Sequence, residues 1–230
     1  MDVTINYLLR DANALKGTVN LNRSAMDEGG FTEENYLTFT TAIEDLQAKE
    51  TAQQNAVENT GEKTAVQNET LERIRKLVSD IRAAAKSTYG KDQRNLKLFK
   101  VGTVITKSVK NLIPVVTALN ELVTERKLLL MKNGLTQVKI DALAAAASDL
   151  NTVDKEQENA KSLQKTRTIE RDTAAKNLQE QVFKIRNFAK ACFSDRPEIL
   201  VQFKPIPKGR SGAGNGEIET PPENSTPPAS

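Results

Sequence analysis

The chain of 230 residues has no histidine, no tryptophan, one cysteine and only 4% aromatic residues. Without histidine it lacks the usual general base, the usual partner of a serine or cysteine nucleophile, and the commonest metal ligand. The single cysteine, Cys192, excludes an intrachain disulfide and a thiol-rich metal site, and its place in a helical apolar pattern indicates a buried apolar group. Because aromatic side chains are so few, the core must consist mainly of aliphatic residues and alanine, which favours slender helix pairs.

Glycine and proline are missing from a long internal segment. Neither occurs between Leu135 and Arg196. In the interior of a helix, glycine is less stable than alanine by roughly 1 kcal/mol and proline by roughly 3 kcal/mol. By contrast, six of the eight prolines follow position 204. We therefore expect a long continuous helix in the second half of the chain, and an extended or disordered tail at 209–230.

Motifs of nucleotide-binding proteins and hydrolases are also missing. No G-x-x-x-x-G-K-[ST], G-x-G-x-x-G or G-x-S-x-G pattern occurs, and the glycine-rich GRSGAGNG follows prolines rather than a strand. We therefore predict no catalytic, cofactor-binding or metal-binding residues, no cofactor and no small-molecule substrate. The expected protein is not an enzyme.

Signals for secretion or membrane insertion are absent from the sequence. The amino terminus has no basic stretch followed by 7–15 apolar residues, the pattern of a Sec signal. The most apolar segment, 101–123, contains Lys107, Lys110 and Glu121 and is interrupted too often to span a bilayer. We expect a cytoplasmic protein, with export by a route that needs no amino-terminal signal as the alternative.

The sequence contains an internal repeat of 104 residues. A shift by this length aligns 30–101 with 134–205 without a gap, and seventeen of the 72 pairs are identical, against roughly 4 or 5 expected for ordinary composition. The chain therefore divides into two helical copies, 1–104 and 105–208, and the tail. Because one copy cannot cover its own apolar stripe, we predict that the copies pack on each other.

Each copy contains a glycine, an apolar residue and a threonine in succession, at 30–32 and 134–136. The glycine is expected to end one helix in a left-handed conformation, the threonine to cap the next, and the apolar residue to pack on that helix. Before this corner the apolar spacing predicts a helix of about 20 residues, at 4–26 and 107–132. Pro114 should kink the second of these helices or mark its real start.

A long helix should follow each corner. Gly61 lies in the polar middle of the first one and would permit a hairpin turn, but its counterpart, Lys165, lies in a segment without a helix breaker. We therefore predict one continuous helix from Thr32 to about Thr88, roughly 85 Å long. The expected fold is all-α, a tandem duplication of a two- to three-helix unit that forms an elongated antiparallel helical bundle or coiled-coil-like rod.

Two charged residues recur in both copies. Asp45 and Arg82 correspond to Asp149 and Arg186. An antiparallel pairing of the long helices would place Asp45 opposite Arg186 and Arg82 opposite Asp149, whereas a hairpin within one copy would join Asp45 to Arg82. In both arrangements we interpret these residues as inter-helix register pairs.

The two copies differ in charge. Residues 1–104 contain 14 lysines and arginines and 15 acidic residues, whereas residues 105–204 contain 17 and 12. Our main hypothesis is a structural or interaction protein that self-associates or binds other proteins. The alternative is a protein that binds nucleic acid or anionic lipid through the basic second copy. The expected contacts of that anionic surface are Lys155, Lys161, Lys165, Arg167 and Arg171.

The repeated pattern also resembles a known group of proteins. It consists of G-[FL]-T, a long Ala/Gln/Thr-rich helix, VSDIRAAAK or VFKIRNFAK, and a short apolar exit with Phe99 or Phe203 as its anchor. This resembles a loose group of uncharacterised bacterial proteins with Ala-rich helical repeats, sometimes found beside fibronectin-like domains. The likeness covers 30–101 and 134–205, and the chain departs from the group in its more polar centre. The resemblance implies a helical fold and a non-catalytic role.

Overall fold

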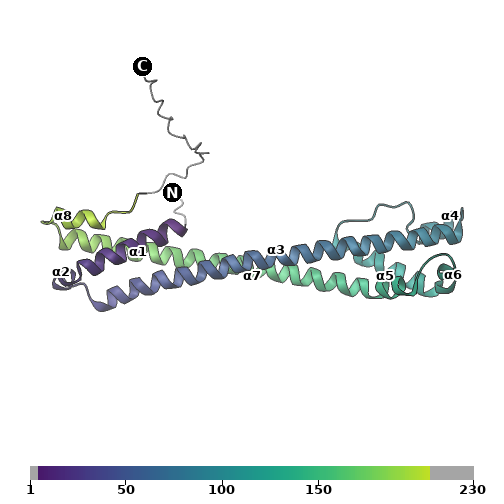
Figure 1. Cartoon of the computed structure of the whole chain (residues 1–230), viewed down its shortest axis with the longest axis horizontal. Coiled ribbons are helices and arrows are strands. Elements are labelled where there is room, and N and C mark those ends of the chain that lie inside the picture. The colour runs from purple at the N-terminus through teal and green to yellow at the C-terminus, as the bar shows by residue number, and fades with distance from the viewer. Residues whose placement is uncertain (1–4, 208–230) are drawn as a thin grey trace, which may run out of the picture.

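The computed structural model describes residues 5–207, and all regular structure in this range is helical. The elements are α1 (Ile5–Leu21), α2 (Arg23–Glu28), α3 (Glu33–Tyr89), α4 (Gln93–Leu98), α5 (Val109–Glu125), α6 (Lys127–Lys132), α7 (Gln137–Cys192), α8 (Pro197–Leu200) and the 3-10 helix η1 (Val201–Phe203). Helices α3 and α7 lie antiparallel, and the shorter helices gather at the two ends (Figure 1). The predicted all-α elongated bundle is confirmed, and the predicted tail at 209–230 lies outside the described residues.

Helix α3 is continuous, as predicted. Its 57 residues extend over about 85 Å at 1.5 Å per residue. Gly61 lies in its middle without a turn, because one glycine costs only about 1 kcal/mol and the helix continues for many residues on both sides. Helix α7 has 56 residues, so the two long helices match in length.

The corner before each long helix has the predicted geometry. Gly30 and Gly134 adopt φ angles of 94° and 99°, in the left-handed region that favours glycine. The Thr32 hydroxyl accepts a hydrogen bond from the Asn35 amide at 3.3 Å, and the Thr136 hydroxyl accepts one from the amide three residues later at 3.4 Å. These caps satisfy amide groups that the first turn of a helix leaves unpaired.

The predicted single helices at 4–26 and 107–132 are wrong in one respect, because each is split in two. The breaks fall at Asn22 and Arg126, which are equivalent positions of the repeat. Arg126 turns its guanidinium toward the Tyr89 hydroxyl and the Asn95 side-chain oxygen, and this contact fixes the end of α5 against α3 and α4. Pro114 lies inside α5 and does not mark its start.

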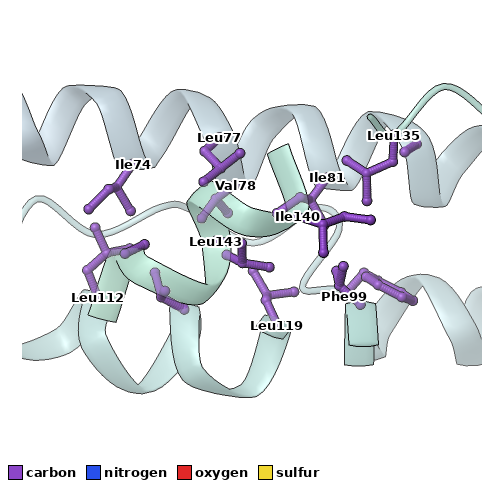
Figure 2. Close-up of a cluster of buried hydrophobic side chains, with 14 of the residues drawn as sticks. Ile74, Leu77, Val78, Ile81, Phe99, Leu112, Leu119, Leu135, Ile140 and Leu143 are labelled. Carbon is purple, nitrogen blue, oxygen red and sulfur yellow. The ribbon is translucent and has the colours of Figure 1, made fainter. Parts of the chain in front are cut away.

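The buried residues form two separate clusters, one at each end of the rod. At what we call the α5 end, α5 and α6 pack against the second half of α3 and the first half of α7. Figure 2 shows Ile74 and Ile81 of α3, Leu112 and Leu119 of α5, and Leu143 of α7 in this cluster. At the α1 end, α1 and Met26 pack against the first half of α3 and the second half of α7.

Each cluster combines both copies of the repeat. Each contains residues of one first helix and of both long helices, so neither 1–104 nor 105–208 contains a whole cluster. Burial follows the repeat, since Phe39 and Leu143 are both fully buried, as are Leu46 and Leu150. Phe99 is buried at the α5 end and Phe203 at the α1 end, so each anchors an exit segment as expected.

A polar waist separates the two clusters. It comprises residues 50–67 of α3 and 151–171 of α7, where Ala56, Gln157 and Ala160 are buried. The Gln157 amide donates to the Thr64 hydroxyl at 3.4 Å. Alanine permits close approach of the two helices, but this small apolar contact stabilises the waist far less than the clusters stabilise the ends.

The interior position of Gly61 leads to a first prediction. We expect Gly61→Ala to raise the free energy of unfolding by up to about 1 kcal/mol, because alanine loses less backbone entropy in a helix and no atom lies within 4 Å of the added methyl group. Thermal unfolding followed by circular dichroism measures this change.

Gly29→Ala is the matched comparison for this prediction. A methyl group at Gly29 would lie 2.6 Å from the Cys192 sulfur, so this substitution should lower the melting temperature, and a second change of Cys192→Ala should restore part of the loss. A destabilising Gly61→Ala would contradict a continuous α3.

Candidate interaction surfaces

Ion pairs between α3 and α7 show the register in which the long helices pack. Lys63 pairs with Glu156 at 2.9 Å, and Arg73 pairs with Asp149 at 2.8 Å. In the five ion pairs between these helices the two residue numbers add up to 219–222, whereas the predicted pairs, Asp45–Arg186 and Arg82–Asp149, add up to 231. The helices are therefore offset by about ten residues, nearly three turns, from the predicted register.

Three of the four predicted register residues consequently have other partners, and the fourth, Asp45, lies on the surface. Within residues 5–207 no ion pair joins Asp45 to Arg186 or Arg82, or Arg82 to Asp149. Arg82 donates instead to the Thr103 carbonyl at 2.8 Å, and burial lowers its pKa. Asp149 pairs with Arg73, and Asp45 lies on the surface of α3 beside Asn177. The recurring arginines thus fasten exit segments rather than set the register.

Arg186 fastens the exit segment of the second copy. Its Nε donates to the Phe203 carbonyl at 2.9 Å, and its Nη2 lies 2.7 Å from the Asp11 carboxylate. Asp11 is buried and also accepts a hydrogen bond from the Ile206 amide at 3.0 Å. The repeat did not indicate Asp11, because Val115 occupies the equivalent position in the other copy.

The five basic residues expected to bind an anionic surface lie on α7 along the waist, and three of them pair with carboxylates. Lys161 lies 3.2 Å from Glu158, and Arg167 lies 2.7 Å from Glu170. Arg171 contacts both Glu50 and Asp172, while Lys155 and Lys165 are exposed and have no ion pair among the described residues. These pairs reduce the positive potential of the waist.

The tip of the α5 end exposes large apolar side chains at positions where the α1 end has none. At the α5 end Leu128 and Val138 are 78% and 77% exposed, and Leu129 and Met131 are exposed as well. The equivalent positions at the α1 end have small or acidic residues, which are Ser24, Glu34, Ala25 and Asp27. Monomeric proteins seldom group exposed large apolar side chains at one place, so the tip of the α5 end is a candidate contact surface.

The two ends also differ in the sign of their charge. At the α5 end, residues 86–96 and 126–138 contain six basic side chains and one acidic side chain, Asp92. The equivalent residues of the α1 end, 190–200 and 22–34, contain three basic and six acidic side chains. Asp92 caps α4, and hydrogen bonds from Asn95 lower its pKa. The rod therefore has a basic end and an acidic end.

Several hollows lie on the surface of the described residues. One hollow of about 280 Å³ lies between α7 and the exit segment, with Phe183, Leu200 and Phe203 in its lining. Lys190 and Lys204 lie beside them, and the lining has no carboxylate, hydroxyl or thiol. Within residues 5–207 no group of three or more cysteine, aspartate or glutamate side chains is arranged to bind a metal ion.

None of the described helices is long and apolar enough to cross a bilayer. No protein-family model, curated protein or solved structure matches the chain.

Proposed function

We propose that this chain is a structural protein that associates with itself through the ends of its rod. The observation that favours this function is the group of exposed apolar side chains at the α5 end, which includes Leu128 and Val138. Exposed leucine, methionine and valine at one tip leave apolar surface in water, and association removes it from water at roughly 25 cal/mol for each Å².

The elongated shape supports the same proposal. Helices of about 85 Å place the two ends far apart, while the long helices are occupied with each other over their whole length. Such a rod suits a spacer or an assembly unit, which needs length and two separated contact surfaces. The alternative, binding of nucleic acid or anionic lipid along the waist, is less favoured because Lys161, Arg167 and Arg171 are paired with carboxylates.

Light scattering coupled to size-exclusion chromatography tests this proposal on the full chain over a wide range of concentrations. We expect a molar mass that rises with concentration above the 25.3 kDa of one chain. Small-angle X-ray scattering should give a maximum dimension of at least about 85 Å. A mass of one chain at every concentration would contradict self-association.

A further inference from the structure

We infer that the α5 end of one protein molecule docks on the α1 end of a second molecule, so that rods join head to tail. This inference rests on the proposed self-association and specifies its geometry. On one molecule the contact surface consists of α6 with Leu128 and Lys132. On the other molecule it consists of α2 with Glu28 and the start of α3 with Glu34.

Charge complementarity decides which ends meet. The two ends are built from equivalent residues of the repeat and share the same order of helices, yet one has an excess of basic side chains and the other an excess of acidic ones. Contact between two α5 ends would bring together side chains such as Lys127, Lys132 and Arg94, and like charges across an interface cost several kcal/mol. Contact between an α5 end and an α1 end brings opposite charges together.

The charges at both ends are available for such a contact. Among the described residues, Lys91, Lys127 and Lys132 at the α5 end take part in no ion pair, and neither do Glu28 and Glu34 at the α1 end. Of the six basic residues at 86–96 and 126–138, Arg126 alone takes part in an ion pair within the described part of the chain, with the adjacent Glu125 at 4.0 Å. Lys127 is half-buried and the other four are exposed, and docking of a second molecule would give these charges partners.

Apolar side chains are present on both ends as well. Leu21, the last residue of α1, is 84% exposed, and the partly buried Ala25 of α2 lies one turn further on. This patch would cover Leu128 and Leu129 of a second molecule, and the surrounding charges would set the orientation of the two molecules. Because the contacting surfaces are different, a docked pair of rods still has one free end of each kind, and assembly continues as an open chain.

The test uses two variants that each block one end. The α5-end variant contains Leu128→Glu and Lys132→Glu, and the α1-end variant contains Glu28→Lys and Glu34→Lys. All four side chains are exposed, so the substitutions leave the core clusters unchanged. The matched control contains Ile169→Glu and Lys165→Glu in the waist, where both side chains are also exposed. Sedimentation velocity of the full chain measures the size of the assemblies.

We expect the wild type and the control to form assemblies that grow with concentration and shrink as salt screens the charges. Each blocked variant should lose association by about thirtyfold or more, as expected when central interface residues are changed. An equimolar mixture of the two variants should form dimers at least, because the α1 end of one variant still fits the α5 end of the other.

Three results would overturn the inference. If the α1-end variant formed dimers alone and the mixture gave no new species, two α5 ends would be the contact. If both variants assembled like the wild type, self-association would stand and the ends would not be its site. If the wild type stayed monomeric and bound phosphatidylserine vesicles while the α5-end variant did not, the partner would be an anionic membrane, and the proposed self-association would fail too.

Discussion

Replacement of Phe39 with alanine should lower the free energy of unfolding of the α1 end by about 3–5 kcal/mol, the range typical of removing a phenylalanine from a packed core. Phe39 is 0% exposed and lies in the cluster that α1 forms with α3 and α7. Loss of its ring leaves a cavity that helices fixed along their whole length cannot close by moving together. Chemical denaturation followed by circular dichroism measures the change.

The effect should be confined to one end of the rod. The waist between the clusters has few buried apolar side chains, so the ends can open as separate cooperative units. Hydrogen exchange measured by mass spectrometry should therefore become faster in α1 and in the first half of α3, and remain unchanged around Leu112 and Leu119 of the α5 end. Uniform acceleration over the whole chain would contradict this division.

Leu37→Ala is the control for this prediction. Leu37 lies two residues earlier on the same helix but is 54% exposed, so its replacement should change stability by less than about 0.5 kcal/mol. Leu143→Ala, at the position equivalent to Phe39, should reproduce the large effect at the opposite end, by about 2–5 kcal/mol.

Local features of this fold could be predicted from the sequence. The corner at 30–32, the unbroken helix through Gly61 and the anchoring role of Phe99 and Phe203 all follow from short patterns found in both copies. Such features depend on caps, helix breakers and apolar spacing, and these act within a few residues. The repeat strengthened each prediction, because two equivalent segments must satisfy the same rule.

The register of the long helices could not be predicted in this way. From the sequence alone, more than one antiparallel arrangement pairs the recurring charged residues, which are Asp45, Arg82, Asp149 and Arg186. The observed offset depends on which turns of α3 and α7 receive α1 and α5, and this is a property of the assembled clusters. Exposed ion pairs of 0–1 kcal/mol follow that packing rather than direct it.

The difference between the ends in exposed apolar and charged side chains lies at positions where the two copies are not identical. The identical positions of the repeat therefore do not indicate it. Positions 128 and 138 are aligned with 24 and 34, and both pairs differ in polarity, the second also in charge. In a duplicated rod, identities indicate what both ends need for folding. Differences at exposed equivalent positions indicate what only one end does.

The second large effect is expected at the buried ion pair of the α1 end. Asp11→Ala should destabilise this end by about 3 kcal/mol, the lower part of the range for removing one partner of a buried pair. The side chain of Asp11 is 5% exposed and that of Arg186 is 17% exposed. Without the carboxylate, the arginine stays charged in a mostly buried place, and the Ile206 amide loses its acceptor.

A second substitution separates the cost of the unpaired charge from that of the cavity. Arg186→Leu added to Asp11→Ala should recover part of the lost stability, because it removes the charge that has no partner. Thermal unfolding measures both variants, and hydrogen exchange at Ile206 reports whether the exit segment is released from α1.

The opposite end provides the control. Arg82 occupies the position equivalent to Arg186 and contacts the Thr103 carbonyl without a carboxylate, and Val115 occupies the position of Asp11. Val115→Ala should therefore lower the free energy of unfolding by only about 1 kcal/mol, the contribution of a half-buried valine. If Asp11→Ala were no more harmful than Val115→Ala, the pair of Asp11 and Arg186 would contribute nothing to the attachment of the exit segment.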